Sequence, residues 1–299
     1  MQLPSREDLP AILIGLAVPH DDIADLVRLM PSPENADVWR LLHNAVRELC
    51  HAGPPPDFRR QYPELGELGR YFYVYVFVAA LGHARRLHAA HGISDDVSRL
   101  TLADLGRSMA LHRKRHGVGG LNLAHWLWRH WRGQLYQLGR LQFERSSLLE
   151  PTAAGLTGAG LPCSPGDPIL EIHIPDLLGP LSPAACDASF ASARDFFPRH
   201  FPDTKPVAMT CTSWLLDPQL AERLPAHSNI TAFQHRFPIT GRVDLPELCD
   251  KPVLRYIFGL TEQPADWDDL PRTTALERVI GDHLRDGGHW YTHLGFIAI

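Results

Sequence analysis

The sequence predicts an α+β protein in which an all-helical N-terminal domain precedes a domain built on a mixed sheet. Two observations support this division. Apolar residues recur at helical spacing up to about Trp131, whereas after Gly133 apolar and polar residues alternate with the period of two that a half-buried strand requires. We therefore place the helical domain at residues 1–131 and the sheet domain at residues 132–299.

The first domain is predicted from its caps, breaks and apolar stripes. Asn35 or Asp37 can cap one helix, which the prolines at 54–56 end, and Ser94 caps another. The apolar run Tyr71–Leu81 suits a strand by composition, but its flanks are helix-like, so we predict one long helix that is buried on all sides. Helices are expected at residues 5–17, 21–30, 35–49, 64–91, 94–111 and 122–131.

The second domain alternates strands and helices. Two of its helices have clear starts, because Ser182–Pro183 and Asp217–Pro218 each place a capping residue before a proline at the first helical position. The stretch at 146–167, rich in Gly, Pro and Ser, is interpreted as a loop that is either disordered or a lid near a site. Strands are expected at residues 135–145, 168–175, 207–216, 230–239 and 290–299, and helices at 182–197, 217–224 and 274–285.

Charge and composition exclude several classes of protein. The net charge of -5, from 29 basic and 34 acidic residues, is unlike the basic excess of nucleic-acid-binding proteins. Five widely spaced cysteines without a C-x-x-C pair argue against a disulfide framework and a thiolate zinc site, and favour a reducing, cytoplasmic setting. We find no signal-peptide pattern, and the longest apolar run is shorter than the roughly 20 residues that span a membrane. Neither nucleic acid nor a membrane is an expected partner, and the oligomeric state stays open.

The helix that starts at Ser182 is a candidate anion site. Its first amide groups would lie beside the end of the strand LEIHIP, Leu170–Pro175, where exposed N–H groups and the helix dipole both favour a phosphate. Gly179 allows a close approach of the backbone to a ligand, whereas Asp187 would repel a phosphate unless its side chain turned away. The alternative is an ordinary capped helix that follows a strand.

Three long segments resemble a known bacterial family. They read HWLWRHWRGQLYQLGRLQFE, LEIHIPD with GPLSPAACDASFASARDFFPRHFP, and CTSWLLDPQLAERLPAHSNITAFQHRF. Similar segments occur in the same order in proteins that combine a helical acyltransferase N-terminal domain with a GNAT-like C-terminal domain. The resemblance implies acyl-coenzyme A as cofactor, for which Gly179, Leu181 and Ser182 are the candidate ligands. It also implies a gap between the LEIHIP strand and the TCTSW strand, where GNAT enzymes admit pantetheine.

One family motif is altered in this chain. The usual GNAT phosphate loop reads Arg or Gln, two residues, Gly, one residue, then Gly or Ala, whereas HIPDLLGPLSPAAC keeps only Gly179 and the helix start. Two functions are therefore open. The first is transfer of an acyl group from acyl-coenzyme A to an amine of a small-molecule or peptide acceptor, with the helical domain shaping the acceptor pocket. The alternative is a non-catalytic GNAT-like protein that binds a metabolite or a partner.

Candidate catalytic residues follow from the chemistry of acyl transfer. The reaction needs a base for the amine, a group that polarises the carbonyl, and an acid for the leaving thiolate. Glu171 and His173 share one face of a strand about 6–7 Å apart, so either can be the base, and Glu144 on the preceding strand is a third candidate. Arg140 can hold a substrate carboxylate, and Ser213 can protonate the thiolate or contact the substrate. A structural salt link is the alternative for Glu171 and His173.

Two further features are judged structural. Cys211 could be a nucleophile with His235 or His173 as its partner, but its apolar strand favours an inert core thiol. His112 and His116 have the helical spacing of a metal pair, but the basic residues 113–115 between them disfavour a cation, so we predict no metal site. This basic patch can attract the phosphates of the coenzyme or form a solvated helix end.

Overall fold

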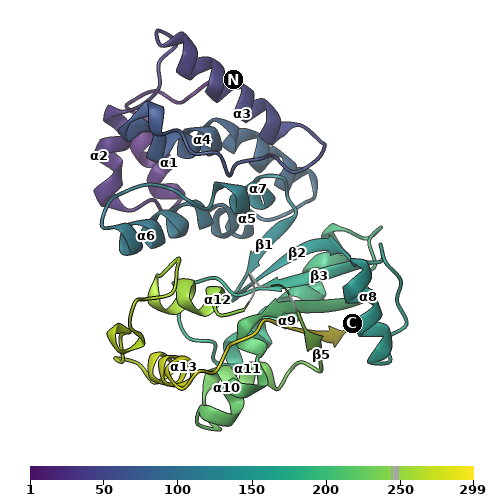
Figure 1. The fold of residues 1–299 in the computed structure, drawn as a ribbon. Coiled ribbons are helices and arrows are strands. Elements are labelled where there is room, and N and C mark those ends of the chain that lie inside the picture. Colours follow the sequence, from purple (N-terminus) through teal and green to yellow (C-terminus); the bar gives the residue numbers. More distant parts are fainter. Residues whose placement is uncertain (244, 246–248) are drawn as a thin grey trace. The chain divides into compact units, whose positions relative to one another are not determined.

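The computed structural model describes residues 1–243, 245 and 249–299 and confirms the α+β class. The chain forms two compact units, Met1–Gln137 and Leu138–Ile299, and each is described by itself (Figure 1). Among the described residues, no helix combines the length and the apolar character that a membrane crossing requires.

The regular elements of the first unit are helices, except that its last residues belong to the strand β1. The buried helix predicted at 64–91 is confirmed as α4, in which most side chains between Tyr71 and Leu81 are buried. The helix predicted at 94–111 is instead two helices, because the chain turns at Ala103. The elements are α1 (Leu9–Gly15), α2 (His20–Arg28), α3 (Ala36–Cys50), η1 (Pro63–Leu65), α4 (Glu67–Ala90), α5 (Asp95–Leu102), α6 (Asp104–His116) and α7 (Ala124–Trp131).

An ion pair between a buried aspartate and a partly exposed arginine lies where α2, α4 and α6 meet. Asp22 is fully buried, and its Oδ1 accepts hydrogen bonds from the hydroxyl of Tyr71 at 2.8 Å and from Nη2 of Arg113 at 2.5 Å. Gly119 leaves space for this contact, since a Cβ there would lie 1.8 Å from Asp22 Oδ1. Arg113, which the sequence placed in the basic patch, is therefore turned inward and holds the helices together.

The second unit contains the sheet, whose strand order is β1-β2-β3-β4-β6-β5. Strands β3 and β4 are parallel, whereas β2–β3, β4–β6 and β5–β6 are antiparallel. The boundary between the units lies within β1. The strands are β1 (Leu135–Leu138), β2 (Leu141–Ser147), β3 (Pro168–His173), β4 (Ala208–Ser213), β5 (Ile239–Arg242) and β6 (His293–Ala298). The helices are α8 (Glu150–Gly158), α9 (Pro183–His200), η2 (Trp214–Leu216), α10 (Pro218–Arg223), α11 (Asn229–Gln234), α12 (Lys251–Val253), η4 (Leu254–Phe258), η5 (Trp267–Asp269) and α13 (Ala275–Arg285).

The predicted strand at 135–145 is two strands joined by a tight turn. Gly139 has a φ of +70°, a left-handed conformation that glycine adopts without strain. The backbone N–H groups of Arg140 and Leu141 donate to Oγ of Ser189 on α9, at 2.8 and 3.3 Å. The alternation of apolar and polar residues continues across the turn, and for this reason the sequence pattern concealed it.

Two more predicted elements were wrong. The predicted loop at 146–167 contains α8, whose buried Ala153 and Leu156 pack in one cluster with Ile169 of β3. The first half of the predicted strand at 230–239 is instead the helix α11, because the hydroxyl of Ser228 caps the N–H of Thr231 and starts a helical turn. In addition, α9 continues through its internal Pro198 to His200 instead of ending before the proline.

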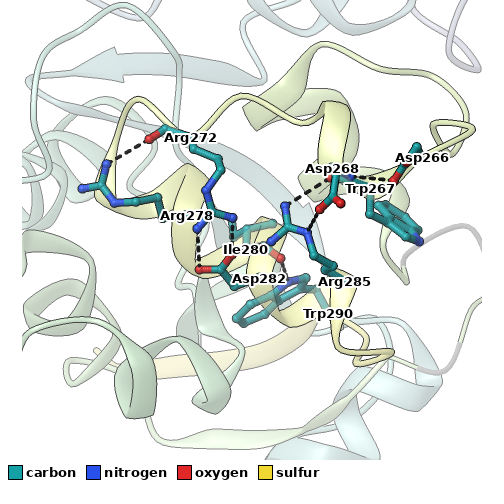
Figure 2. Close-up of polar contacts among 9 residues, drawn as sticks. All are labelled: Asp266, Trp267, Asp268, Arg272, Arg278, Ile280, Asp282, Arg285 and Trp290. Carbon is teal, nitrogen blue, oxygen red and sulfur yellow. Dashed lines mark hydrogen bonds and ion pairs between the residues drawn. The ribbon is translucent and has the colours of Figure 1, made fainter.

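Helix α13 is confirmed and begins with a capping box. Figure 2 shows that Asp282 on this helix pairs with Arg272 and Arg285. The indole N–H of Trp290 donates to the carbonyl of Ile280 at 3.2 Å, also drawn in Figure 2. The contact of Trp290 anchors to α13 the chain that leads from this helix into β6.

Replacing the helix cap Ser182 with alanine is expected to lower the free energy of unfolding by about 1 kcal/mol. The hydroxyl of Ser182 accepts the N–H of Ala185 at 3.3 Å, and this donor would lose its partner. Urea denaturation measures the change. Ser192→Ala, at an exposed position of the same helix, is the matched control and should stay within about 0.5 kcal/mol of the parent. Equal losses for both variants would contradict a capping role.

Candidate active site

Three predicted catalytic side chains meet on the strands β2 and β3. The antiparallel register places Glu144 opposite Glu171 and Gln142 opposite His173. One oxygen or nitrogen atom from each of Glu144, Glu171 and His173 lies within 4.8 Å of the others. The ring Nε2 of His173 and Oε2 of Glu144 are 2.9 Å apart, which is hydrogen-bond distance. The structure thus brings these groups together into one acid–base cluster.

The cluster is protected from solvent but not sealed. The side chains of Glu144 and His173 are 11% and 19% exposed. Charge-assisted hydrogen bonds are stronger in such surroundings than in water. Glu144 can therefore orient the imidazole of His173 and stabilise the imidazolium ion that forms when the ring accepts a proton.

The two parallel strands separate at this cluster. Among the described residues, β3 and β4 are paired at two positions, Leu170 opposite Met209 and Glu171 opposite Thr210. His173 lies beyond the last pair, and residues 211–213 pair with β6 on the other side. The pairing between LEIHIP and TCTSW thus ends before either strand does, as the expected gap between them requires. Carboxyl ends of parallel strands are also where open α/β sheets bind ligands.

The side chains on β4 have different environments. Cys211 is 1% exposed, and burial raises the pKa of its thiol well above the usual range, which disfavours the nucleophilic thiolate. His235, considered as its partner, is exposed at the end of α11. Ser213 lies opposite His293, and its Oγ accepts the N–H of Leu215 at 3.1 Å. This bond leaves the hydroxyl hydrogen of Ser213 as a donor.

The loop between β3 and α9 is held by Arg140. Its Nε donates to the carbonyl of Gly179 at 2.9 Å and its Nη1 to the carbonyl of Pro175 at 3.0 Å. Burial lowers the pKa of this guanidinium from its ordinary value. Gly179 has a φ of +77° and faces open space, and Leu177 has a φ of +62° with an exposed side chain. Arg140 therefore stabilises a loop that contains an unfavourable backbone conformation.

A second arginine, Arg236, contacts the start of α9 from the segment that follows α11. The sequence pattern did not indicate this contact. Arg236 pairs with Asp187, and its Nη2 donates to the carbonyl of Pro183 at 3.2 Å. The hydrogen bond from Arg236 lowers the pKa of Asp187. The predicted repulsion between Asp187 and a phosphate is thus offset by a cation at the same turn. Leu181 is buried, and Ser182 caps the helix.

Comparison with known proteins assigns the family. Residues 7–133 match the N-acyltransferase N-terminal domain, and residues 135–297 match the GNAT-like C-terminal domain. The chain belongs to this family of two-domain acyltransferases. The predicted fold and the family resemblance are therefore confirmed. A comparison with curated proteins gave no match.

Several solved structures of acyltransferases are similar over nearly the whole chain. An acyltransferase in complex with decanoyl-CoA is 35% identical with a TM-score of 0.85, and the match covers 100% of this chain and 89% of that chain. An acyltransferase in complex with decanoyl-CoA and teicoplanin is 37% identical with a TM-score of 0.84, covering 99% and 89%. A third, with CoA and 10C-Teicoplanin, is 36% identical with a TM-score of 0.84, covering 99% and 89%.

Proposed function

We propose that this acyltransferase moves an acyl group from acyl-coenzyme A to an amine of a small-molecule or peptide acceptor. The observation that carries the proposal is the acid–base cluster of Glu144, Glu171 and His173 at the point where β3 and β4 separate. Similar acyltransferases have been solved with acyl-CoA, and two of them with teicoplanin or 10C-Teicoplanin. A teicoplanin-type glycopeptide is therefore the first acceptor to test.

In this proposal His173 is the general base. With its Nε2–H donated to Glu144, the imidazole accepts the proton of the acceptor ammonium at its other nitrogen. Glu171, beside it, attracts the ammonium before the proton is removed. The amine nitrogen then attacks the thioester carbonyl, the C–N bond forms, and the C–S bond breaks. Ser213 is the proposed donor to the departing thiolate, and its hydroxyl regains a proton from the nitrogen of the new amide.

The coenzyme would be held at the start of α9. Backbone N–H groups near Gly179, Leu181 and Ser182 offer donors to the diphosphate, and the helix dipole favours its charge. We propose that Arg236 compensates for the motif residues that are missing from the phosphate loop. Arg140 is proposed to hold this loop in position. Its role toward a substrate carboxylate remains a prediction.

A thiol-release assay tests the proposed activity. The purified protein is mixed with acetyl-CoA, octanoyl-CoA or decanoyl-CoA and with teicoplanin or simple primary amines, and mass spectrometry detects the acylated product. We expect free thiol and acylated amine in equal amounts. Binding of acyl-CoA without any product across the panel would favour the alternative, a non-catalytic GNAT-like binding protein.

A further inference from the structure

A second cluster of metal-binding side chain types lies near the start of β6, and none of its members belongs to the candidate active site. Cys249, Asp250 and His289 each place one ligand-type atom within 4.8 Å of the other two. Nδ1 of His289 and Oδ2 of Asp250 are 2.7 Å apart. Thiol, imidazole and carboxylate are the three ligand types that zinc takes in proteins.

A backbone bridge and two hydrogen bonds hold in place the two chain segments that contain this cluster, around Cys249 and around His289. Cys249 forms an isolated antiparallel bridge with Tyr291. The backbone N–H of Tyr291 donates to Oδ2 of Asp217 at 2.8 Å, and Nε2 of Gln219 donates to the carbonyl of His289 at 2.9 Å. The side chain of His289 is thus attached to a chain segment that is fixed on both sides.

Asp250 is the most constrained member of the cluster. It is 7% exposed, and its Oδ1 accepts the backbone N–H of Trp290 at 2.7 Å. Trp290 is itself buried and anchored to α13 through its indole (Figure 2). A carboxylate whose one oxygen is oriented by a hydrogen bond and whose other oxygen faces imidazole has the outer support that metal-binding carboxylates show.

The spacing and the charges suit a divalent ion. Ligand atoms around tetrahedral zinc lie about 3.3–3.6 Å apart. The 2.7 Å between His289 Nδ1 and Asp250 Oδ2 would have to widen, and all three ligand-type atoms already lie within 4.8 Å of one another, so small side-chain rotations suffice. A thiolate favours zinc over magnesium or calcium. Thiolate and carboxylate together balance a charge of +2, although Arg242, stacked on Tyr291, adds a positive charge nearby. His289, with 55% of its side chain exposed, leaves a route of entry.

We propose that Cys249, Asp250 and His289 form a zinc site whose fourth position is taken by water. On binding, the thiol of Cys249 releases its proton, and the imidazole of His289 takes the neutral tautomer that carries its proton on Nε2. The sulfur, Nδ1 and a carboxylate oxygen then become ligands. The site is independent of the proposed acyl transfer. Without a metal, the same residues would be an ordinary His–Asp pair with an adjacent thiol.

Cobalt titration tests the site directly. The full chain is stripped with a chelator and titrated with Co²⁺, which replaces zinc and gives a charge-transfer absorption only when a thiolate is a ligand. We expect this band to saturate at one ion per chain and to disappear when Zn²⁺ is added. Cys249→Ser should abolish the band. His289→Ala, which removes a side chain that is 55% exposed, should weaken cobalt binding by at least about tenfold.

Two matched variants control the titration. Cys163→Ser removes another partly buried cysteine and should leave the band unchanged. Glu144→Gln alters the other cluster of potential ligands, which lacks sulfur, and should also leave it unchanged. Absence of the band in the parent protein, or its survival in Cys249→Ser, would overturn the proposal and leave the His–Asp pair as the correct description.

Discussion

Replacing His173 with alanine is expected to lower kcat for acyl transfer by about 10²–10⁴-fold, the usual contribution of a positioned general base. The KM for acyl-CoA should change little, because the proposed coenzyme ligands lie on the loop and at the start of α9. Steady-state thiol release with saturating acyl-CoA measures both constants. Glu171→Gln should raise the KM for the amine more than it lowers kcat, since this carboxylate is proposed to attract the ammonium.

Glu144→Gln separates orientation from charge. Glutamine can still accept a hydrogen bond from His173, but it cannot stabilise the imidazolium ion. We therefore expect kcat to fall less than in His173→Ala, and the double variant to be no worse than His173→Ala alone, because residues that act as a unit are not additive.

The control for these variants is His227→Ala, which removes an exposed histidine of the same unit and should leave kcat unchanged. Far-ultraviolet circular dichroism and thermal unfolding establish that each variant is folded. A folded His173→Ala protein with parental kcat would remove the histidine from the mechanism, and a large kcat loss in Glu171→Gln alone would make Glu171 the base.

Local chemistry predicted the elements that position the site. A capping hydroxyl or carboxylate followed by proline predicted the starts of α9 and α10, because both groups act within four residues of the helix start. The two-residue period placed Glu171 and His173 on one face of β3. Sequence failed where two signals compete, as at Ile230 and Thr231, whose β-branched side chains suit a strand although the cap at Ser228 starts a helix.

Contacts between distant residues could not be predicted from the pattern. Arg140 reaches the carbonyl of Gly179 across 39 residues, and Arg236 reaches Asp187 across 49. The pair of Asp250 and His289 is likewise 39 residues apart, so the search for C-x-x-C spacing did not reveal it. Hydrophobic period and caps report on neighbours along the chain, whereas these contacts depend on strand order and on helix packing.

Arg113→Met is expected to destabilise the first unit by about 3 kcal/mol, because it leaves the carboxylate of Asp22 buried without its cation. Asp22 is fully buried, and its Oδ2 has no hydrogen-bond partner among the described residues. In Arg113→Met, the hydroxyl of Tyr71 is the hydrogen-bond donor to Oδ1 that remains. Methionine keeps most of the side-chain volume, so the loss reports mainly on charge. Urea denaturation of the full chain, followed by circular dichroism of the helices, measures it.

A surface pair of the same kind provides the comparison. Arg40 and Asp37 form an i, i+3 pair on α3 with side chains 73% and 84% exposed, so Arg40→Met should cost less than about 1 kcal/mol. Adding Asp22→Asn to Arg113→Met removes the uncompensated charge while keeping an acceptor for Tyr71, and should restore about 1–2 kcal/mol. If Arg113→Met were as mild as Arg40→Met, the arginine would belong to the solvated basic patch that the sequence suggested, and Asp22 would be stabilised by Tyr71 alone.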